Sequence, residues 1–202
     1  MKRYENGFPR QLQGIDFSTL EESAQSVFGL SPELTLNYFN QAWMNFSNNN
    51  GGEPGISTRF PLGANLKQAI SGEIADFYMK KYEEVLQTGN VWNHEYECSS
   101  YDQYRLFHQI TFPLKNKAGL IVVNSLTVDL PMQEIKRISC SPIEELYRQP
   151  SGFITQCSNC RRSQRAFQAE IWDWVPEWIR QAPPKISHSI CPICSDYYWK
   201  YG

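Results

Sequence analysis

The sequence lacks the features that would mark a membrane or secreted protein. No apolar run approaches the roughly eighteen residues that a membrane-spanning helix needs. The first residues contain no apolar run of the kind found in a secretion signal. We therefore expect a cytoplasmic protein with no membrane contact. The net charge of -2 over 202 residues also excludes a general electrostatic attraction to nucleic acid.

Recognisable catalytic patterns are missing as well. The chain has three histidines, and we find no nucleophile elbow, no paired catalytic carboxylates and no open set of metal ligands. It has no glycine-rich phosphate loop and no Cys-x-x-Cys-His sequence for covalent haem attachment. The sequence therefore predicts that the protein is not an enzyme, and it assigns neither haem nor flavin.

The cysteines, in contrast, follow an informative pattern. Cys157 and Cys160 form one Cys-x-x-Cys pair, and Cys191 and Cys194 form a second pair after an interval of thirty residues. Four thiolates in this spacing are typical of a tetrahedral zinc ion. In a reducing compartment, zinc is favoured over a disulfide framework. Because four thiolates leave no open coordination position, the predicted zinc site is structural.

Three further residues bear on this site. His188 is an alternative ligand, but with four cysteines available we expect it to donate a hydrogen bond to the site instead. Cys98 is expected to face inward from a strand, and Cys140 to be a free thiol in a connector. A separate interpretation is a thiol-based redox sensor, in which oxidation of the thiolates ejects the metal.

Arg161, Arg162 and Arg165 lie next to the first cysteine pair. Residues 157–202 carry six Lys and Arg against four Asp and Glu, so the segment is only mildly basic. Four thiolates around one divalent ion carry a net negative charge, which we expect these arginines to offset. The alternative is a zinc-dependent nucleic-acid-binding regulator, but such proteins usually present a wider basic face. Nucleic acid is therefore not expected as a partner.

The chain before the cysteines predicts an α+β domain. Its hydrophobic pattern has a period of two in the expected strands and of 3.6 in the expected helices. The expected helices are a short one over 20–26, one over 41–48 with Asn40 as its N-cap, and a long one from Leu66 to Gly89. The expected strands are 27–30, 34–39, 91–98, 104–114 and 120–128.

This order of elements resembles that of PAS domains, the sensory modules of bacterial signalling proteins. The local matches are residues 27–31, 40–43 and 96–100, and the resemblance covers about 20–130. It implies a five-stranded antiparallel sheet with helices on one face, a ligand held between them, and dimerisation. The tail, with Cys-x-x-Cys followed by Ser-His-x-Ile-Cys-Pro-x-Cys, resembles the cysteine-rich tails that accompany such domains and treble-clef zinc sites.

Three polar residues on the last three strands are candidates for a ligand pocket. If the turn after the third strand places Cys98 opposite Tyr104, His94 lies opposite His108. Asn124 lies on the apolar face of the final strand. Buried polar side chains need partners, so these residues either line a pocket or are satisfied core residues. The first interpretation depends on the register, which the sequence leaves open.

The predicted organisation has four parts. They are an N-terminal arm (1–19), a PAS-like domain (20–130), a connector (131–156) and a zinc-binding tail (157–202). We expect a signal-sensing or protein-interaction module that acts through contact with another protein and forms a homodimer. The tail would present Trp172, Trp174, Trp178 and Tyr197 to that partner, because exposed aromatic residues mark interfaces.

Overall fold

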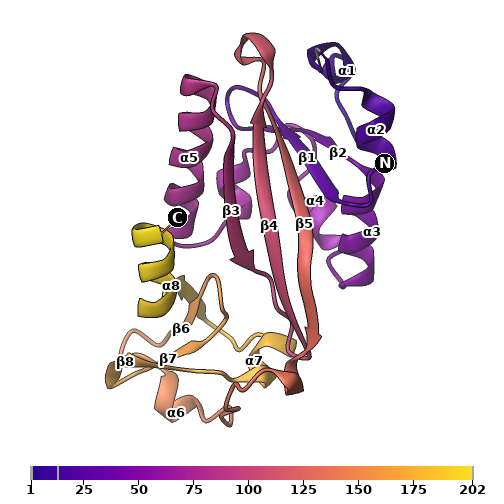
Figure 1. The fold of residues 1–202 in the computed structure, drawn as a ribbon. Coiled ribbons are helices and arrows are strands. Elements are labelled where there is room, and N and C mark those ends of the chain that lie inside the picture. The colour runs from indigo at the N-terminus through magenta and orange to yellow at the C-terminus, as the bar shows by residue number, and fades with distance from the viewer. Residues whose placement is uncertain (1, 13, 202) are drawn as a thin grey trace. The chain divides into compact units, whose positions relative to one another are not determined.

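The computed structural model describes residues 2–12 and 14–201, whose helices and strands are drawn in Figure 1. The chain forms two compact units. Unit 1 comprises Met1–Ile70, Tyr78–His94 and His108–Ser125. Unit 2 comprises Ser71–Phe77, Glu95–Phe107 and Leu126–Gly202. The four-part organisation predicted from the sequence stays a prediction.

A five-stranded sheet is built from β1 (Ser26–Leu30), β2 (Leu36–Phe39), β3 (Trp92–Glu97), β4 (Gln103–Pro113) and β5 (Leu120–Pro131). Its order is β2-β1-β5-β4-β3, and β1 pairs antiparallel with both β2 and β5. The first and last strands of the domain therefore meet in its middle. The predicted fold class, α+β with a PAS-like five-stranded antiparallel sheet, is confirmed.

The helices before β3 are α1 (Phe8–Gln11), α2 (Phe17–Glu22), α3 (Gln41–Asn49), α4 (Gly55–Arg59), a 3-10 turn (Leu66–Ala69) and α5 (Ile74–Thr88). The predicted N-cap of α3 is confirmed: Asn40 Oδ1 accepts from the Trp43 N–H at 2.9 Å and from the Val27 N–H at 3.0 Å. The same buried side chain therefore fixes both the start of α3 and the start of β1. Pro54 precedes the short α4 as its N-cap residue.

The long helix begins later than its apolar pattern predicts. Leu66–Ala69 form only a 3-10 turn, and α5 starts at Ile74. Gly72 lies between them with φ +72, and an added Cβ there would stand 2.8 Å from Ser158 Oγ. The left-handed backbone and the close approach interrupt the helix, although the apolar spacing continues across the break. The predicted end at Gly89, φ +75, is confirmed.

The N-terminal arm is ordered by packing within unit 1. Phe8 and Leu12 are buried in a cluster with Tyr38, and the rings of Phe8 and Tyr38 stack at 4.5 Å. Tyr4 forms a β-bridge with Tyr38, and the Glu5 N–H donates to the Asn37 carbonyl at 3.0 Å. The arm thus covers the outer edge of β2, which would otherwise expose unpaired backbone groups.

After β5 the chain forms a 3-10 turn (Met132–Glu134), α6 (Glu144–Tyr147), β6 (Ile154–Cys157), β7 (Ser163–Arg165), β8 (Gln168–Asp173), α7 (Pro176–Arg180), β9 (Ile186–Ser189), α8 (Pro192–Asp196) and a final π-helical turn (Tyr197–Tyr201). The strands form a sheet of order β8-β7-β6-β9. A small core of Tyr147, Ile154, Val175 and Trp178 packs within unit 2.

Candidate metal centre and buried polar groups

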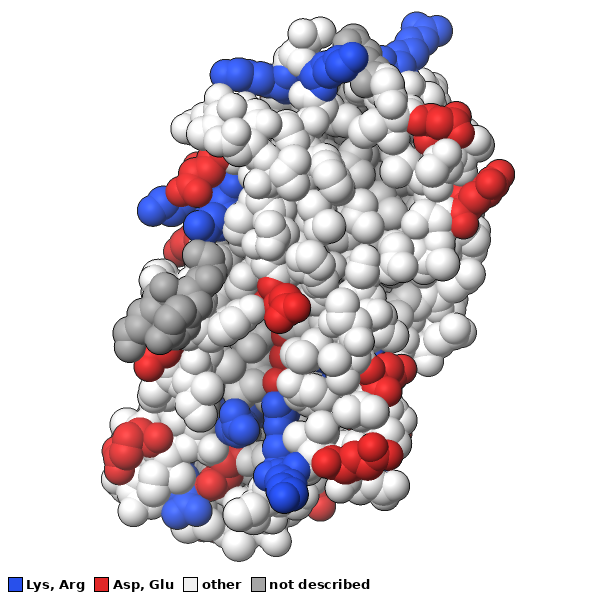
Figure 2. Space-filling model, in the orientation of Figure 1, with Lys and Arg blue, Asp and Glu red and all other residues white. Residues whose placement is uncertain are grey.

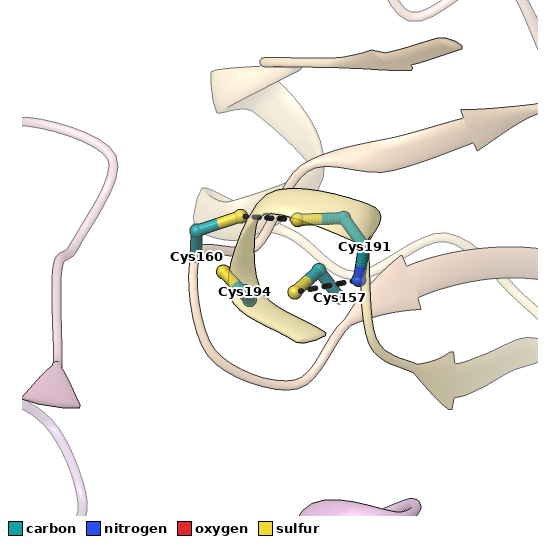
Figure 3. A group of neighbouring side chains, drawn as sticks. All are labelled: Cys157, Cys160, Cys191 and Cys194. Atoms are coloured by element: carbon teal, nitrogen blue, oxygen red, sulfur yellow. Dashed lines mark hydrogen bonds between the residues drawn. The ribbon is translucent and has the colours of Figure 1, made fainter. Parts of the chain in front are cut away.

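The sulfur atoms of Cys157, Cys160, Cys191 and Cys194 point toward one another (Figure 3). They all lie within 4.8 Å of one another, and the four residues are at most 5% exposed. Cys160 Sγ and Cys191 Sγ are 3.6 Å apart, far beyond the roughly 2.05 Å of a disulfide bond. Zinc–sulfur bonds of about 2.3 Å in a tetrahedron set sulfurs about 3.8 Å apart. The donor set and its spacing fit a metal ion.

Strand pairing brings the two cysteine pairs together. β6 and β9 are parallel neighbours, with Cys157 opposite Ser189. The Ser158 N–H donates to the Ser189 carbonyl at 2.8 Å, which continues the pairing one residue into the first cysteine turn. Each cysteine pair therefore begins at the same end of adjacent strands. This explains how two cysteine pairs separated by thirty residues in the sequence form one site.

Each turn has a local cause. In the first, Arg161 adopts φ 63, and the Cys157 N–H donates to the Arg162 carbonyl at 2.8 Å, so the chain reverses from β6 toward β7. In the second, Cys191 is the N-cap of α8 and Pro192 occupies the first turn, which suits its fixed φ. Cys194 then lies one helical turn beyond Cys191. Both turns direct their two thiols to the same side.

Among the described residues, three N–H groups donate hydrogen bonds to the sulfurs. The Cys191 N–H donates to Cys157 Sγ at 3.4 Å, the Asn159 amide to Cys194 Sγ at 3.3 Å, and the Arg162 guanidinium to Cys160 Sγ at 3.6 Å. Arg162 therefore occupies the charge-offsetting position predicted for it. Arg165 instead pairs with Asp173 at 2.6 Å. No pattern in the sequence indicates a role for Asn159, because its contacts with Cys194, Glu97 and Tyr198 form only in the folded chain.

The thiols influence one another's protonation. Hydrogen bonds from Cys160 and the two cysteines of the second pair move the pKa of Cys157 well below its usual range. The hydrogen bond with Cys157 raises the pKa of Cys160, but those with Cys191 and Cys194 outweigh it and lower that pKa to about 7. The bonds with Cys157 and Cys160 raise the pKa values of Cys191 and Cys194. A cation would have to displace the remaining protons, so metal binding should release protons.

The other predicted residues around this site lie apart from the sulfurs. Among the described residues, the group with metal-ligand spacing contains the four cysteines and does not include His188. His188 is opposite Gln156 in the β6–β9 pair, and burial lowers its pKa. Cys140 is half-buried against the small core of unit 2. Burial raises the pKa of the Cys98 thiol.

A second group of polar side chains is buried in unit 1. The Tyr82 hydroxyl on α5 donates to Gln109 Oε1 on β4 at 2.9 Å. Gln109 Nε2 donates to Asn124 Oδ1 on β5 at 3.2 Å, and Asn124 Nδ2 donates to the Ser26 carbonyl on β1 at 3.4 Å. One chain of hydrogen bonds thus links the long helix to three strands. Asn124, a predicted pocket residue, belongs to this chain.

The predicted histidine pair is not formed. The Cys98 N–H donates to the Arg105 carbonyl at 3.0 Å, which shifts the register by one residue from the predicted Cys98–Tyr104 pairing. The buried residues of β4 alternate as Phe107, Gln109 and Thr111, so His108 is directed to the opposite face. A slip of one residue exchanges the two faces of a strand. Gln109 therefore takes the place that the sequence assigned to His108.

His94, the remaining candidate, is 4% exposed. Its ring stacks on Trp92 at 5.5 Å and meets the Tyr78 ring edge-to-face at 6.0 Å. Burial, together with the positive charge of Lys81, lowers the pKa of His94 to about 4 from the ordinary 6.5. The neutral imidazole is the form that this environment accepts. His94 therefore contributes mainly by packing.

Lowering the pH should reduce the stability of the folded protein through His94. Between pH 6.5 and about 4 the unfolded chain binds the His94 proton and the folded chain does not, so stability present above pH 6.5 is lost as pH falls. The slope from one group is at most about 1.4 kcal/mol per pH unit. Urea unfolding at pH 7, 6 and 5 should show a smaller loss for His94→Phe than for wild type. Parallel losses in the two proteins would contradict the assigned role.

The aromatic residues expected to meet a partner differ in exposure. Trp174 and Trp178 are buried, at 3% and 7% exposure, and so are not available at the surface. The prediction was wrong for these two because both pack within unit 2, where Trp178 meets the Tyr147 ring edge-to-face at 5.0 Å. Tyr197 is 37% exposed and Trp199 is 51% exposed. Trp172 is partly buried against the four cysteines, so Tyr197 is the exposed member of the predicted set.

No protein-family model matches the chain, and no curated protein does. It is similar to several solved structures. A domain of an HTR-like protein from Haloarcula marismortui is 16% identical with a TM-score of 0.38, over 52% of this chain and 100% of that one. The PAS domain of a Colwellia psychrerythraea protein is 9% identical with a TM-score of 0.39, over 54% of this chain and 91% of that one.

The PAS domain of nitrogen regulation protein NR(II) from Vibrio parahaemolyticus is 15% identical with a TM-score of 0.32, over 53% of this chain and 92% of that one. Likeness at this level supports no conclusion about activity. The description of the fold as PAS-like rests on the antiparallel sheet of order β2-β1-β5-β4-β3 and on its helices. Among the described residues, no helix is long and apolar enough to cross a membrane.

Proposed function

We propose that the chain is a signal-sensing or protein-interaction module of bacterial signal transduction, with a PAS-like domain, a structural zinc site and no catalytic activity of its own. A fold by itself does not define a function, so the proposal needs a site. The observation that carries it is the buried hydrogen-bond chain from Tyr82 through Gln109 to Asn124. A ligand that competes for these polar groups would alter how α5 is held on the sheet.

Zinc is the ion that best suits the four cysteines. Thiolates select soft or borderline metals, and a four-thiolate tetrahedron is a common structural zinc site. Cys157, Cys160, Cys191 and Cys194 would hold the ion and fill its coordination sphere. With no position for water or substrate, the ion would contribute folding free energy and no Lewis-acid chemistry. This supports a non-catalytic role for the tail.

The structure does not favour the two alternative functions. The face shown in Figure 2 carries positive and negative side chains interspersed with uncharged surface, without the wide basic area that nucleic acid binding requires. A thiol redox sensor needs accessible thiolates, whereas the four clustered cysteines are at most 5% exposed. We also propose that the protein is located in the cytoplasm, forms a homodimer and contacts a protein partner.

Two measurements test the proposal. Elemental analysis of protein purified without chelator should find about one zinc per chain, as one four-thiolate site requires.

The second measurement concerns the sensing site. A ligand found by screening small metabolites for thermal stabilisation should no longer stabilise Asn124→Leu, because the substitution removes the amide that accepts from Gln109. His108→Leu is the matched control, since His108 lies on the opposite face of β4. Protein without metal would refute the zinc site, and a ligand unaffected by Asn124→Leu would refute the assigned sensing site.

A further inference from the structure

Asn159 lies inside the first Cys-x-x-Cys pair and contacts three different elements of unit 2. Its Nδ2 donates to Cys194 Sγ at 3.3 Å. Its Oδ1 accepts from the Glu97 N–H at the end of β3 at 3.2 Å, and from the Tyr198 hydroxyl at 3.2 Å. A carboxamide oxygen has two lone pairs, and both are used here. The side chain thus joins a sulfur of the candidate site to a strand and to the C-terminal turn.

The orientation of this amide depends on the cysteine cluster. Nδ2 and Oδ1 are opposite ends of one planar group, so an amide that donates to the sulfur necessarily directs its oxygen away from it. Cys157 and Cys160 flank Asn159 in the same tight turn, and Cys194 comes from α8. A metal that fixes these sulfurs would therefore fix the amide plane. Outer hydrogen bonds of this kind orient ligands and strengthen metal binding.

The two groups that donate to Asn159 Oδ1, the Glu97 N–H and the Tyr198 hydroxyl, belong to residues that make further contacts in unit 2. Glu97 makes two hydrogen bonds to the Arg137 guanidinium, at 2.7 and 2.6 Å. Tyr198 is 2% exposed, and its ring meets the Phe77 ring edge-to-face at 5.0 Å. Releasing the amide would leave the Glu97 N–H and the Tyr198 hydroxyl without this acceptor. The end of β3 and the C-terminal turn would then lose order together.

We propose that Asn159 is a positioning residue that couples occupation of the four-cysteine site to the order of the end of β3 and of the turn around Tyr198. This inference rests on the proposed metal site and extends it, because the ion would then control more than the fold of the tail. The distinctive prediction concerns a backbone amide outside the cysteine turns, that of Glu97. Its hydrogen exchange should respond to zinc.

The test uses the full chain, zinc ion and three variants. Zinc affinity is measured by competition with a chromophoric chelator, and exchange of the Glu97 amide by NMR, with and without zinc. In wild type, zinc should slow Glu97 exchange. Asn159→Ala should weaken zinc binding by about 10- to 100-fold, the usual cost of losing an outer hydrogen-bonding partner, and should leave Glu97 in fast exchange even at saturating zinc.

Two further variants separate the roles of the amide. Asn159→Asp keeps an oxygen for the Glu97 N–H but replaces the donor to sulfur with a negative charge, so it should weaken zinc binding while Glu97 stays protected at saturating zinc. Ser158→Ala is the matched control, because Ser158 Oγ donates to the Ser189 carbonyl at 3.1 Å and not to a sulfur. It should bind zinc as wild type does and should protect Glu97.

The possible results distinguish the coupling proposed for Asn159 from the zinc site on which that coupling rests. A wild-type chain that binds no zinc overturns both. A wild-type chain that binds zinc without any change at the Glu97 amide overturns the coupling and leaves the zinc site standing. Wild-type zinc affinity or a protected Glu97 in Asn159→Ala also overturns it. If Asn159→Ala does not fold, Asn159→Asp decides: weaker zinc binding with a protected Glu97 supports the coupling, and any other combination opposes it.

Discussion

Replacing Cys194 by serine is expected to reduce bound zinc from about one per chain to a small fraction, and to unfold the sheet that carries the cysteines. The small core of unit 2 has four residues at its centre, Tyr147, Ile154, Val175 and Trp178. A structural zinc ion contributes about 10–16 kcal/mol of folding free energy in small zinc-binding peptides. That is comparable to the roughly 5–15 kcal/mol that stabilises an entire domain. Losing one of four ligands should therefore cost the tail its fold.

Elemental analysis and backbone amide exchange check this expectation. Amides of β6 and β9 should exchange rapidly in Cys194→Ser, and in wild type treated with a strong chelator. Cys140→Ser is the matched control, because Cys140 lies against the small core and outside the sulfur cluster. It should keep its zinc and its exchange protection. If Cys194→Ser retains both metal and protection, the four cysteines do not hold the tail together.

Local signals in the sequence were sufficient for much of the fold. The β1–β2 hairpin turns where Ser31 Oγ accepts from the Glu33 N–H at 3.2 Å, a bond between near neighbours that the Ser-Pro sequence indicates. Asn40 caps α3 as its residue type predicts. The two cysteine pairs form one cluster, as their spacing predicts. In each case the determining contact is short-range or belongs to a motif with fixed geometry.

The predictions that were wrong concern features determined by contacts between residues far apart in the sequence. The break before α5 depends on Gly72 approaching Ser158, which lies far along the chain. The register of β3 and β4 depends on which of two adjacent residues faces Cys98, and alternation alone does not distinguish them. β9 pairs in parallel with β6, and its sequence Ile-Ser-His-Ser has no strong strand signal. Such features come from tertiary packing, which a single sequence reveals poorly.

The same reason explains why the Arg137–Glu97 pair was missed. The two residues are forty positions apart, and nothing near either one in the sequence indicates its partner. In the structure their side chains are 10% and 8% exposed, and the Arg137 guanidinium lies 5.0 Å from the Trp174 ring centre and 5.1 Å from that of Tyr104. The ion pair is thus almost fully buried and doubly hydrogen-bonded, and its guanidinium lies close to two aromatic rings. We expect the stability of unit 2 to depend strongly on it.

Substituting Arg137 by alanine is therefore expected to lower the free energy of unfolding by about 3–5 kcal/mol, because it leaves the Glu97 carboxylate buried without its partner. Arg137→Lys should recover only part of this loss, since an ammonium cannot make both hydrogen bonds or stack on Trp174. In the double variant Arg137→Met, Glu97→Met the loss should be smaller than in Arg137→Ala, because no charge is then left unpaired.

A second, more exposed ion pair provides the control. Asp129 is 46% exposed and lies 3.4 Å from Arg105. Asp129→Asn should therefore lower the free energy of unfolding by less than about 1 kcal/mol. Urea unfolding of the wild type and of all four variants measures these differences. A double variant at least as unstable as Arg137→Ala would show that packing against Trp174 and Tyr104, and not the buried charge, sets the cost.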